Sequence, residues 1–134
     1  MIIDKQILDE LSAKAKANPR LRQNMDLRNS PEDLSQRMLN ALEPGTIMPI
    51  HRHHGSSETV VIIRGKIKWI FFDDNGIEVE QVTLDANGDL RMLNVEQDRW
   101  HSLVCLEEGS VLYESKDGPY QPLQEYEIMT LSEK

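Results

Sequence analysis

Two histidines and a glutamate stand close together near the middle of the chain, and these residue types bind metal ions. One residue separates His51 from His53, and four residues separate His53 from Glu58. Residues two apart on an extended strand point to the same face, with Cα atoms about 6.6 Å apart. A chain reversal through residues 54–57 would bring the Glu58 carboxylate beside both imidazoles. Imidazole and carboxylate donors together indicate a site for a divalent metal.

Two glycines frame this group of possible metal ligands. Five residues lie between Gly45 and His51, and six lie between Glu58 and Gly65. Gly65 stands where the strand after Glu58 is predicted to end. The tight turn expected there needs a residue that tolerates a positive φ angle.

This spacing resembles the first motif of the cupin superfamily: Gly, five residues, His-x-His, three or four residues, Glu, six residues, Gly. The second cupin motif is weak here, because an alignment on His101 leaves only that histidine matched. Glu96 and Asp98 stand where that motif has proline and glycine, and Cys105 stands where it has asparagine. The resemblance implies an all-β cupin fold, a double-stranded β-helix or jelly-roll barrel. It also implies a set of four metal ligands, namely His51, His53, Glu58 and His101.

Over nearly its whole length the chain is also similar to the WbuC-type cupin fold metalloproteins. The similarity rests on the order and spacing of several segments and on the pair Arg22 and Asn24. The segments are QRMLNALEPGT at 36–46, HRHH at 51–54, FFDDNG at 71–76 and WHSLVCLEEGSVLYESKDGPYQP at 100–122. This group is associated with bacterial surface-polysaccharide gene clusters, which implies sugar chemistry without identifying a reaction.

The elements that position these residues are predicted to be one short helix followed by about eight short strands. Asp4 is expected to cap the helix, and apolar residues from Ile7 to Ala15 form a stripe that ends before Pro19. The strands are expected at 35–42, 46–53, 59–63, 66–72, 77–84, 90–95, 99–106 and 111–115, with a further candidate at 125–131. Residues 1–30 are then an N-terminal helix and arm that pack on the barrel, and residues 31–134 are a single cupin barrel domain.

Three arginines lie between positions 20 and 28 of a chain that is acidic overall. This stretch is either a solvated linker, or Arg22 and Asn24 reach the mouth of the metal site. In the second case they would hold an anionic or hydroxyl-rich molecule. Glu114 and Tyr120 are further candidates for substrate binding. His54 leaves the strand on the opposite face from His53, so we expect it not to bind the metal.

Three histidines and one glutamate around a six-coordinate ion leave about two positions for water or substrate. This favours one divalent ion (Zn, Fe, Mn, Ni or Co) and a small sugar-like or carboxylate substrate that is isomerised or epimerised. A non-catalytic module that binds or senses a sugar, a metal-dependent dioxygenase and a purely structural ion are the alternatives. No catalytic residue can be named from the sequence.

Composition narrows the range of partners. The formal net charge of −8 argues against a nucleic-acid partner, because phosphate binding relies on clustered Lys and Arg. The first residues, MIIDKQILDEL, have neither the apolar length of a membrane span nor the features of a signal peptide. Cys105 is the one cysteine, so no internal disulfide can form and a cytoplasmic location is expected. The cupin resemblance also implies a homodimer that forms through an edge strand.

Overall fold

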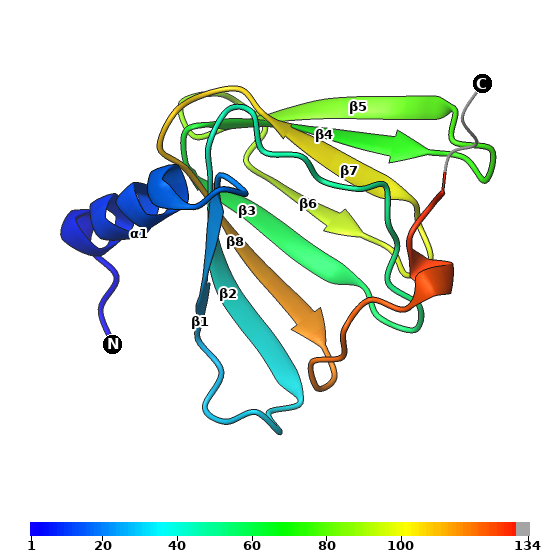
Figure 1. The fold of residues 1–134 in the computed structure, drawn as a ribbon, viewed down its shortest axis with the longest axis horizontal. Coiled ribbons are helices and arrows are strands. Elements are labelled where there is room, and N and C mark those ends of the chain that lie inside the picture. The colour runs from blue at the N-terminus through cyan, green and yellow to red at the C-terminus, as the bar shows by residue number, and fades with distance from the viewer. Residues whose placement is uncertain (131–134) are drawn as a thin grey trace.

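The computed structural model describes residues 1–130, which form two antiparallel β-sheets and one α-helix. The larger sheet has the strand order β1-β2-β8-β3-β6, and the smaller sheet has the order β5-β4-β7. In Figure 1 the smaller sheet lies along the top and the larger sheet fans out below it. The strands are β1 (Arg22–Asp26), β2 (Ser35–Leu42), β3 (Glu58–Arg64), β4 (Lys66–Phe72), β5 (Glu78–Asp85), β6 (Met92–Val95), β7 (His101–Cys105) and β8 (Ser110–Asp117).

The helix α1 (Lys5–Ala17) covers the outer face of the larger sheet. The Asp4 carboxylate accepts a hydrogen bond from the Ile7 amide at 3.0 Å, so Asp4 is the N-cap that the sequence predicts. Leu11 and Ala15 are buried against apolar residues of β2 and β8. No helix in residues 1–130 combines the length and the apolar character that crossing a membrane requires. Because α1 lies outside, the face of the larger sheet that meets the smaller sheet stays free for the site.

Alternate residues of β2 divide between these two faces. Leu39 and Ala41 pack with α1, whereas Leu42 belongs to the core between the sheets. The same period of two places the inward side chains of β3, β4 and β8 in that core. The fully buried members of the core include Leu42, Val60, Ile67, Trp69, Leu84, Val95 and Leu112. This apolar packing fixes the positions of the strands. Other residues of the same strands carry the polar side chains described below.

Strand register brings a row of polar residues to the inner face of the larger sheet. Glu58 on β3 pairs with Lys116 on β8, and Lys116 pairs with Gln36 on β2. Glu114, two residues before Lys116 on β8, pairs with Val60 on β3. Residues two apart on a strand share a face, so Glu114 and Lys116 point inward like Glu58.

The prediction of a strand at 46–53 is wrong. Within this segment His51 alone takes part in β pairing, through isolated bridges to His101 and Ile128. Pro49 has no amide hydrogen to donate to a ladder, and the backbone of this loop divides its hydrogen bonds between two different neighbours. The remaining predicted strands are present: those at 35–42 and 66–72 have the predicted bounds, and the others have shifted ends.

Two other segments also differ from expectation. Residues 22–26 form the edge strand β1, which was not predicted because its sequence has no alternation of apolar residues. At the other end of the chain, a 3₁₀ helix, η1 (Glu125–Glu127), stands where a further strand was a candidate. Position 131 of that candidate lies outside the described residues.

A β-bulge interrupts the pairing of β4 with β5. Phe71 pairs with Glu80, but the next residue, Phe72, pairs with Glu78. Val79 is therefore left unpaired between them.

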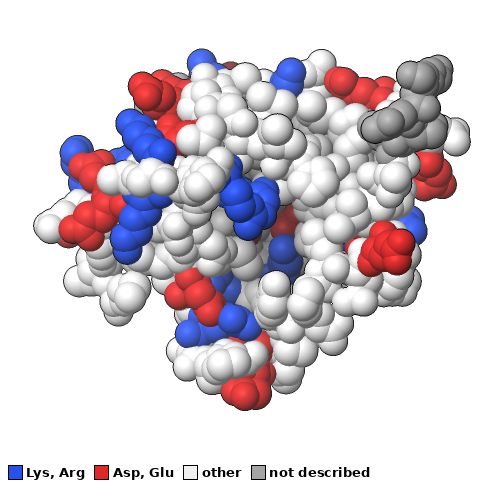
Figure 2. All heavy atoms as spheres, viewed as in Figure 1, with Lys and Arg blue, Asp and Glu red and all other residues white. Residues whose placement is uncertain are grey.

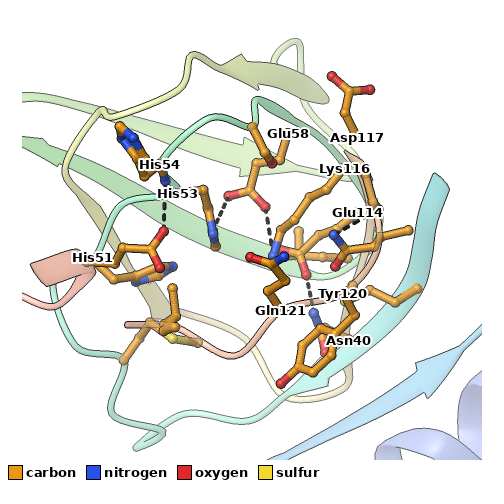
Figure 3. A pocket seen from close by; sticks show the side chains of 18 of the residues that line it. Asn40, His51, His53, His54, Glu58, Glu114, Lys116, Asp117, Tyr120 and Gln121 are labelled. Carbon is orange, nitrogen blue, oxygen red and sulfur yellow. Dashed lines mark hydrogen bonds and ion pairs between the residues drawn. The ribbon is translucent and has the colours of Figure 1, made fainter. Parts of the chain in front are cut away.

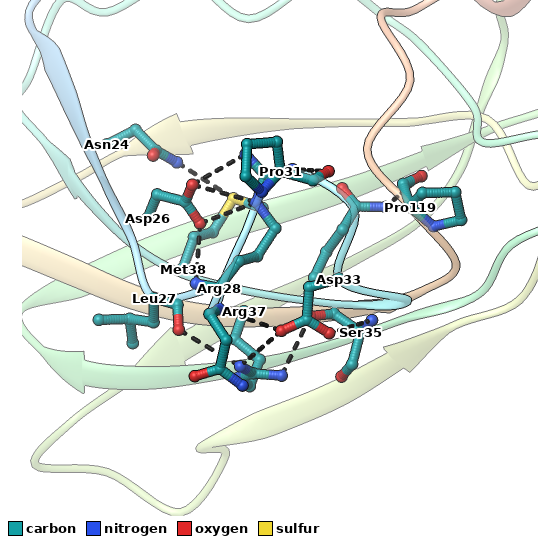
Figure 4. A network of polar contacts seen from close by, with 12 residues as sticks. Asn24, Asp26, Leu27, Arg28, Pro31, Asp33, Ser35, Arg37, Met38 and Pro119 are labelled. Carbon is teal, nitrogen blue, oxygen red and sulfur yellow. Dashed lines mark hydrogen bonds and ion pairs between the residues drawn. The ribbon is translucent and has the colours of Figure 1, made fainter.

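Charged hydrogen bonds fix the connection between β1 and β2 (Figure 4). Arg28 Nη2 lies 2.8 Å from Asp26 Oδ2, and Arg37 Nη2 lies 3.0 Å from Asp33 Oδ2. Arg37 also donates to the Leu27 carbonyl at 3.3 Å. These contacts hold the C-terminal end of β1 beside β2, and the pairing of Arg22 with Leu42 places Arg22 at the other end of β1.

Gly65, which links β3 to β4, allows the chain to pass close to Ser110 at the start of β8, and this generates a stability prediction. Its φ angle is +88°, and a Cβ atom there would lie 2.7 Å from Ser110 Cα and closer still to Ser110 Oγ. We expect Gly65→Ala to lower the free energy of unfolding by about 3 kcal/mol or more, measured by urea denaturation.

Gly55→Ala is the matched control, because Gly55 has a φ angle of +78° but no atom within 4 Å of an added Cβ. It should cost only about 1 kcal/mol, the penalty for the left-handed conformation. Equal losses in the two variants would contradict the packing argument.

Candidate metal centre

Three imidazoles and one carboxylate meet between the two sheets. One ring nitrogen each from His51, His53 and His101 lies within 4.8 Å of the others. Glu58 Oε1 is 3.1 Å from His101 Nε2 and 3.6 Å from His53 Nε2. Donors that bind one transition metal at about 2.1 Å are themselves about 3 to 4 Å apart, so this cluster is close to the size of a metal site.

Backbone pairing places two of these histidines next to each other. The His51 amide donates to the His101 carbonyl at 3.0 Å, and the His101 amide donates to the His51 carbonyl at 2.9 Å. The Trp69 ring stacks on the His101 ring, with centroids 5.3 Å apart and an angle of 14° between the planes. His101 is thus held by β7, by the loop that carries His51 and by the core.

Hydrogen bonds to carbonyl groups select the ring nitrogen that is free to bind a metal. His51 Nδ1 is 2.9 Å from the Pro49 carbonyl, and His101 Nδ1 is 2.9 Å from the Arg99 carbonyl. A carbonyl oxygen only accepts, so both Nδ1 atoms carry a proton, and Nε2 is the atom of each ring that can offer a lone pair to a metal ion.

Several donor atoms of the cluster are buried without a hydrogen-bond partner among the described residues. They are His53 Nε2, His101 Nε2 and Glu58 Oε2. The contact of His101 with Glu58 has the distance of a hydrogen bond without its geometry. Buried polar atoms without partners cost free energy, and a divalent cation between them would remove that cost. The residues present therefore fit a metal ion.

Electrostatics hold these groups in the protonation states that metal binding needs. Burial, followed by the charge of His101, lowers the pKa of His51 to about 3. Burial, followed by the charge of Lys116, lowers the pKa of His53 to about 4. Burial alone would raise the pKa of Glu58, but the close contacts of His101 and Lys116 outweigh burial and lower it. Near neutral pH, both imidazoles are neutral and the carboxylate is ionised.

A cavity of about 450 Å³ adjoins the cluster and is lined by His51, His53 and Glu58 on one side. Figure 3 shows these side chains pointing into it, with Glu114, Lys116 and Asn40 across from them. In the space-filling view the same face is hollowed near its centre (Figure 2). This volume is within the usual range for small-molecule sites.

Three of the four residues predicted to bind substrate line this cavity. The Arg22 guanidinium contacts only a weak acceptor there, the Met48 sulfur at 3.2 Å. Tyr120 lies at the mouth and is 57% exposed. Asn24 is not part of the cavity wall. Its Nδ2 donates to Asn40 Oδ1 at 3.1 Å, and Asn40 does line the cavity.

Glu114 is the third predicted residue in the cavity wall, and it is buried. Asn40 Nδ2 donates to one of its carboxylate oxygens. Burial, and then the negative charge of Glu58, raise the pKa of Glu114 from 4.5 to about 7. The cavity thus contains a carboxyl group that exchanges a proton near neutral pH.

His54 stays outside the cluster of three histidines. Its side chain is 65% exposed, and its Nδ1 atom lies 2.8 Å from Asp98 Oδ1. Asp98 has a φ angle of +65° and stands where the second cupin motif has a glycine. Asp98 therefore adopts at this position a backbone conformation that glycine takes readily.

The sequence analysis did not identify Lys116 and Glu127 as part of the site. Lys116 Nζ is 3.6 Å from Glu58 Oε2. The alternation along β8 could have found Lys116, because it follows Glu114 by two residues. The Glu127 carboxylate accepts a hydrogen bond from the His54 amide at 2.8 Å, and no sequence motif or periodicity predicts that contact.

Comparison with solved structures identifies the fold. KdgF from Halomonas sp. is similar with a TM-score of 0.61 and 16% identity, over 77% of this chain and 84% of that one. CapF from Staphylococcus aureus, described as a capsular polysaccharide assembling protein, has a TM-score of 0.64 and 19% identity over 78% of this chain. Bacillus subtilis oxalate decarboxylase, described with Mn(II) centres, has a TM-score of 0.58 and 20% identity over 75% of this chain. The chain spans only 28% of CapF and 26% of oxalate decarboxylase.

These structural neighbours have the cupin fold, so the predicted fold class is confirmed. Curated protein sequences include no match to the chain. A family model described as a domain of unknown function, DUF6016, matches residues 3–84. That range is more than half of the chain, and it contains His51, His53 and Glu58. The chain therefore belongs to the DUF6016 family.

Proposed function

We propose that this protein binds one divalent transition-metal ion through His51, His53, Glu58 and His101, and that it acts there on a small molecule. The observation that carries the proposal is the set of buried donor atoms without partners at the wall of a cavity of about 450 Å³. The ion is Zn, Fe, Mn, Ni or Co. The Mn(II) centres of oxalate decarboxylase support a divalent ion in this fold.

A metal ion with open coordination positions would polarise a carbonyl or lower the pKa of a bound water. The chain supplies the arrangement around it. Glu58 provides the one negative charge among the four donors, and Lys116 orients its second oxygen from 3.6 Å. The Nδ1 bonds of His51 and His101 to main-chain carbonyls keep both Nε2 atoms directed at the same point.

The substrate we propose is small and either sugar-like or a carboxylate, and it occupies the cavity. Arg22 would bind an anionic or hydroxyl group, because within residues 1–130 its guanidinium donates a hydrogen bond only to a weak acceptor, the Met48 sulfur. Glu114 would hold or release a proton near the bound molecule, and Tyr120 would contact it at the mouth. Asn24 would act through Asn40, to which it donates. No residue is assigned as catalytic.

An isomerase- or epimerase-type reaction in surface-polysaccharide metabolism is the activity we favour. The support is the WbuC-type similarity of the sequence, together with the description of CapF as a capsular polysaccharide assembling protein. A module that binds or senses a sugar without turning it over, and a metal-dependent dioxygenase, are the alternatives.

The domain boundaries, the oligomeric state and the cellular location also stay predictions. We propose residues 1–30 as the arm and residues 31–134 as the barrel domain, a homodimer in solution, and a cytoplasmic location. Size-exclusion chromatography with light scattering tests the homodimer.

Substitution of single donors generates the first functional prediction. His53→Ala should weaken metal binding at least about 100-fold, because it removes a donor that has no other partner. Glu58→Gln should weaken it as much or more, since it removes the only negative donor. His101→Ala should weaken binding and still fold. Titration of metal-free protein with Zn²⁺ measures all three.

His54→Ala is the matched control, because its side chain is exposed and bonded to Asp98. It should keep close to one equivalent of metal per chain with an affinity near that of wild type. If His54→Ala lost the ion while His53→Ala kept it, the proposed set of donors would be wrong.

The proton held by Glu114 generates a second prediction, made for metal-free protein. Its pKa is 4.5 when exposed and about 7 when folded, so the folded state binds more protons than the unfolded state between these values. Wild type should therefore lose stability relative to Glu114→Gln as the pH rises from 5 to 8. The difference in the free energy of unfolding should grow by about 2.5 kcal/mol, measured by urea denaturation.

Glu78→Gln on β5 controls for the loss of one exposed negative charge. Its difference from wild type should change by less than about 0.5 kcal/mol over the same range. A Glu114→Gln difference that stays flat from pH 5 to 8 would mean that Glu114 is ionised throughout, and would remove the proton from the proposed site.

A further inference from the structure

The segment that carries His51 and His53 is a loop, so contacts outside it must fix where the two imidazoles lie. Between β2 and β3, His51 alone takes part in β pairing. A loop of this length has many accessible conformations, and each would place the imidazoles differently relative to Glu58. The hydrogen bonds of its backbone therefore decide the geometry of the candidate metal centre.

One side of this loop is held by β7 and by the turn that precedes it. His51 and His101 exchange two backbone hydrogen bonds of 3.0 and 2.9 Å. The Asp98 amide donates to the His53 carbonyl at 2.9 Å. These bonds fix the loop to the barrel from one direction only.

The other side is held by the C-terminal segment, defined here as residues 118–130. The Arg52 amide donates to the Glu127 carbonyl at 2.9 Å, and the Met129 amide donates to the Ile50 carbonyl at 2.9 Å. In Figure 1 this segment leaves the end of β8 and runs to the 3₁₀ helix at the right, beside the loop. The backbone of residues 127–129 thus pairs with the loop.

The Glu127 carboxylate makes a second connection between the two segments. Its Oε2 accepts from the His54 amide at 2.8 Å, and its Oε1 accepts from the Gln124 amide at 2.9 Å. The residue is only 8% exposed. A buried carboxylate is costly unless it is hydrogen-bonded, and bonds to an ionised acceptor are about twice as strong as neutral ones. One side chain therefore spans the gap between the 3₁₀ helix and the end of the HRHH stretch.

We infer that Glu127 is a positioning residue for the metal centre: it ties the C-terminal segment to the His54 amide and so fixes the loop that carries His51 and His53. The effect on metal affinity rests on the metal binding proposed above, whereas the connection itself does not. His54 then contributes its backbone amide to the site, although its side chain is exposed. The same connection shapes the cavity wall, which Tyr126 and Glu127 line.

Titration with Co²⁺, followed by visible absorption, tests the inference, because the bands of Co²⁺ report the arrangement of its donors. Glu127→Gln has nearly the same shape but turns an amide NH₂ toward one of the two main-chain amides. We expect it to weaken Co²⁺ binding by about 10-fold or more, the size typical of residues that orient metal ligands. The spectrum at saturating Co²⁺ should also change, which a general loss of stability would not cause.

Glu125→Gln is the matched control, because Glu125 begins the same 3₁₀ helix and is exposed. It should bind Co²⁺ within about 2-fold of wild type and give the same spectrum. A folded Glu127→Gln variant with unchanged affinity and spectrum would overturn the inference.

Amide hydrogen exchange in metal-free wild type tests the connection without any variant. The Arg52 and His54 amides should exchange at least about 10 times more slowly than the Gly55 amide, which donates to none of the residues described. Equal rates would overturn the inference even if Glu127→Gln failed to fold. If wild type took up no Co²⁺, the proposed metal site would fail, while the exchange rates would still decide whether Glu127 ties the loop.

Discussion

The pairing of His51 with His101 is the interaction on which the candidate site depends. Two backbone hydrogen bonds join a loop to the start of β7 and set two imidazole rings with centroids 4.3 Å apart. His101 is 50 positions after His51 in the chain, so this pairing brings together donors that local sequence cannot. The core strands provide the fixed side of the pair, since Trp69 on β4 stacks against His101.

Several polar and charged side chains are buried in this barrel, and their neighbours explain their protonation states. Glu58 would be costly to bury alone, but His101 and Lys116 lie within 3.6 Å of its carboxylate and keep it ionised. Glu114, further along the same sheet face, is buried near the negative charge of Glu58, and these two effects outweigh the hydrogen bond from the Asn40 amide, so its pKa is raised and it holds its proton to higher pH. Two carboxylates on one sheet thus take different protonation states because their neighbours differ. That difference gives the cavity a charged end near the histidines and a proton-exchanging group across from them.

The sequence predicted those parts of the site whose spacing is local. His51, His53 and Glu58 stand within eight positions, and both their proximity and the positive φ angle of Gly65 follow from their pattern. His101 came from the cupin resemblance, because a single histidine at the start of an apolar strand has no chemical meaning by itself. The edge strand β1 was missed because its residues are polar and partly exposed, so burial leaves no period in them. The strand predicted at 46–53 is a loop because its backbone partners are two separate segments, and such tertiary pairing leaves no local pattern. Glu127 was missed for the same reason, since its role comes from contact with residues more than 70 positions earlier.

An anomalous-scattering map from crystals grown without added metal tests the central claim most directly, because it gives both the element and its position. The account predicts one transition-metal peak per chain, at about 2.0 to 2.3 Å from donors of His51, His53, Glu58 and His101. The peak should adjoin the cavity, with at least one coordination position directed into it. A peak held by His54, or the absence of any peak after the crystals are soaked in Zn²⁺, would contradict the account.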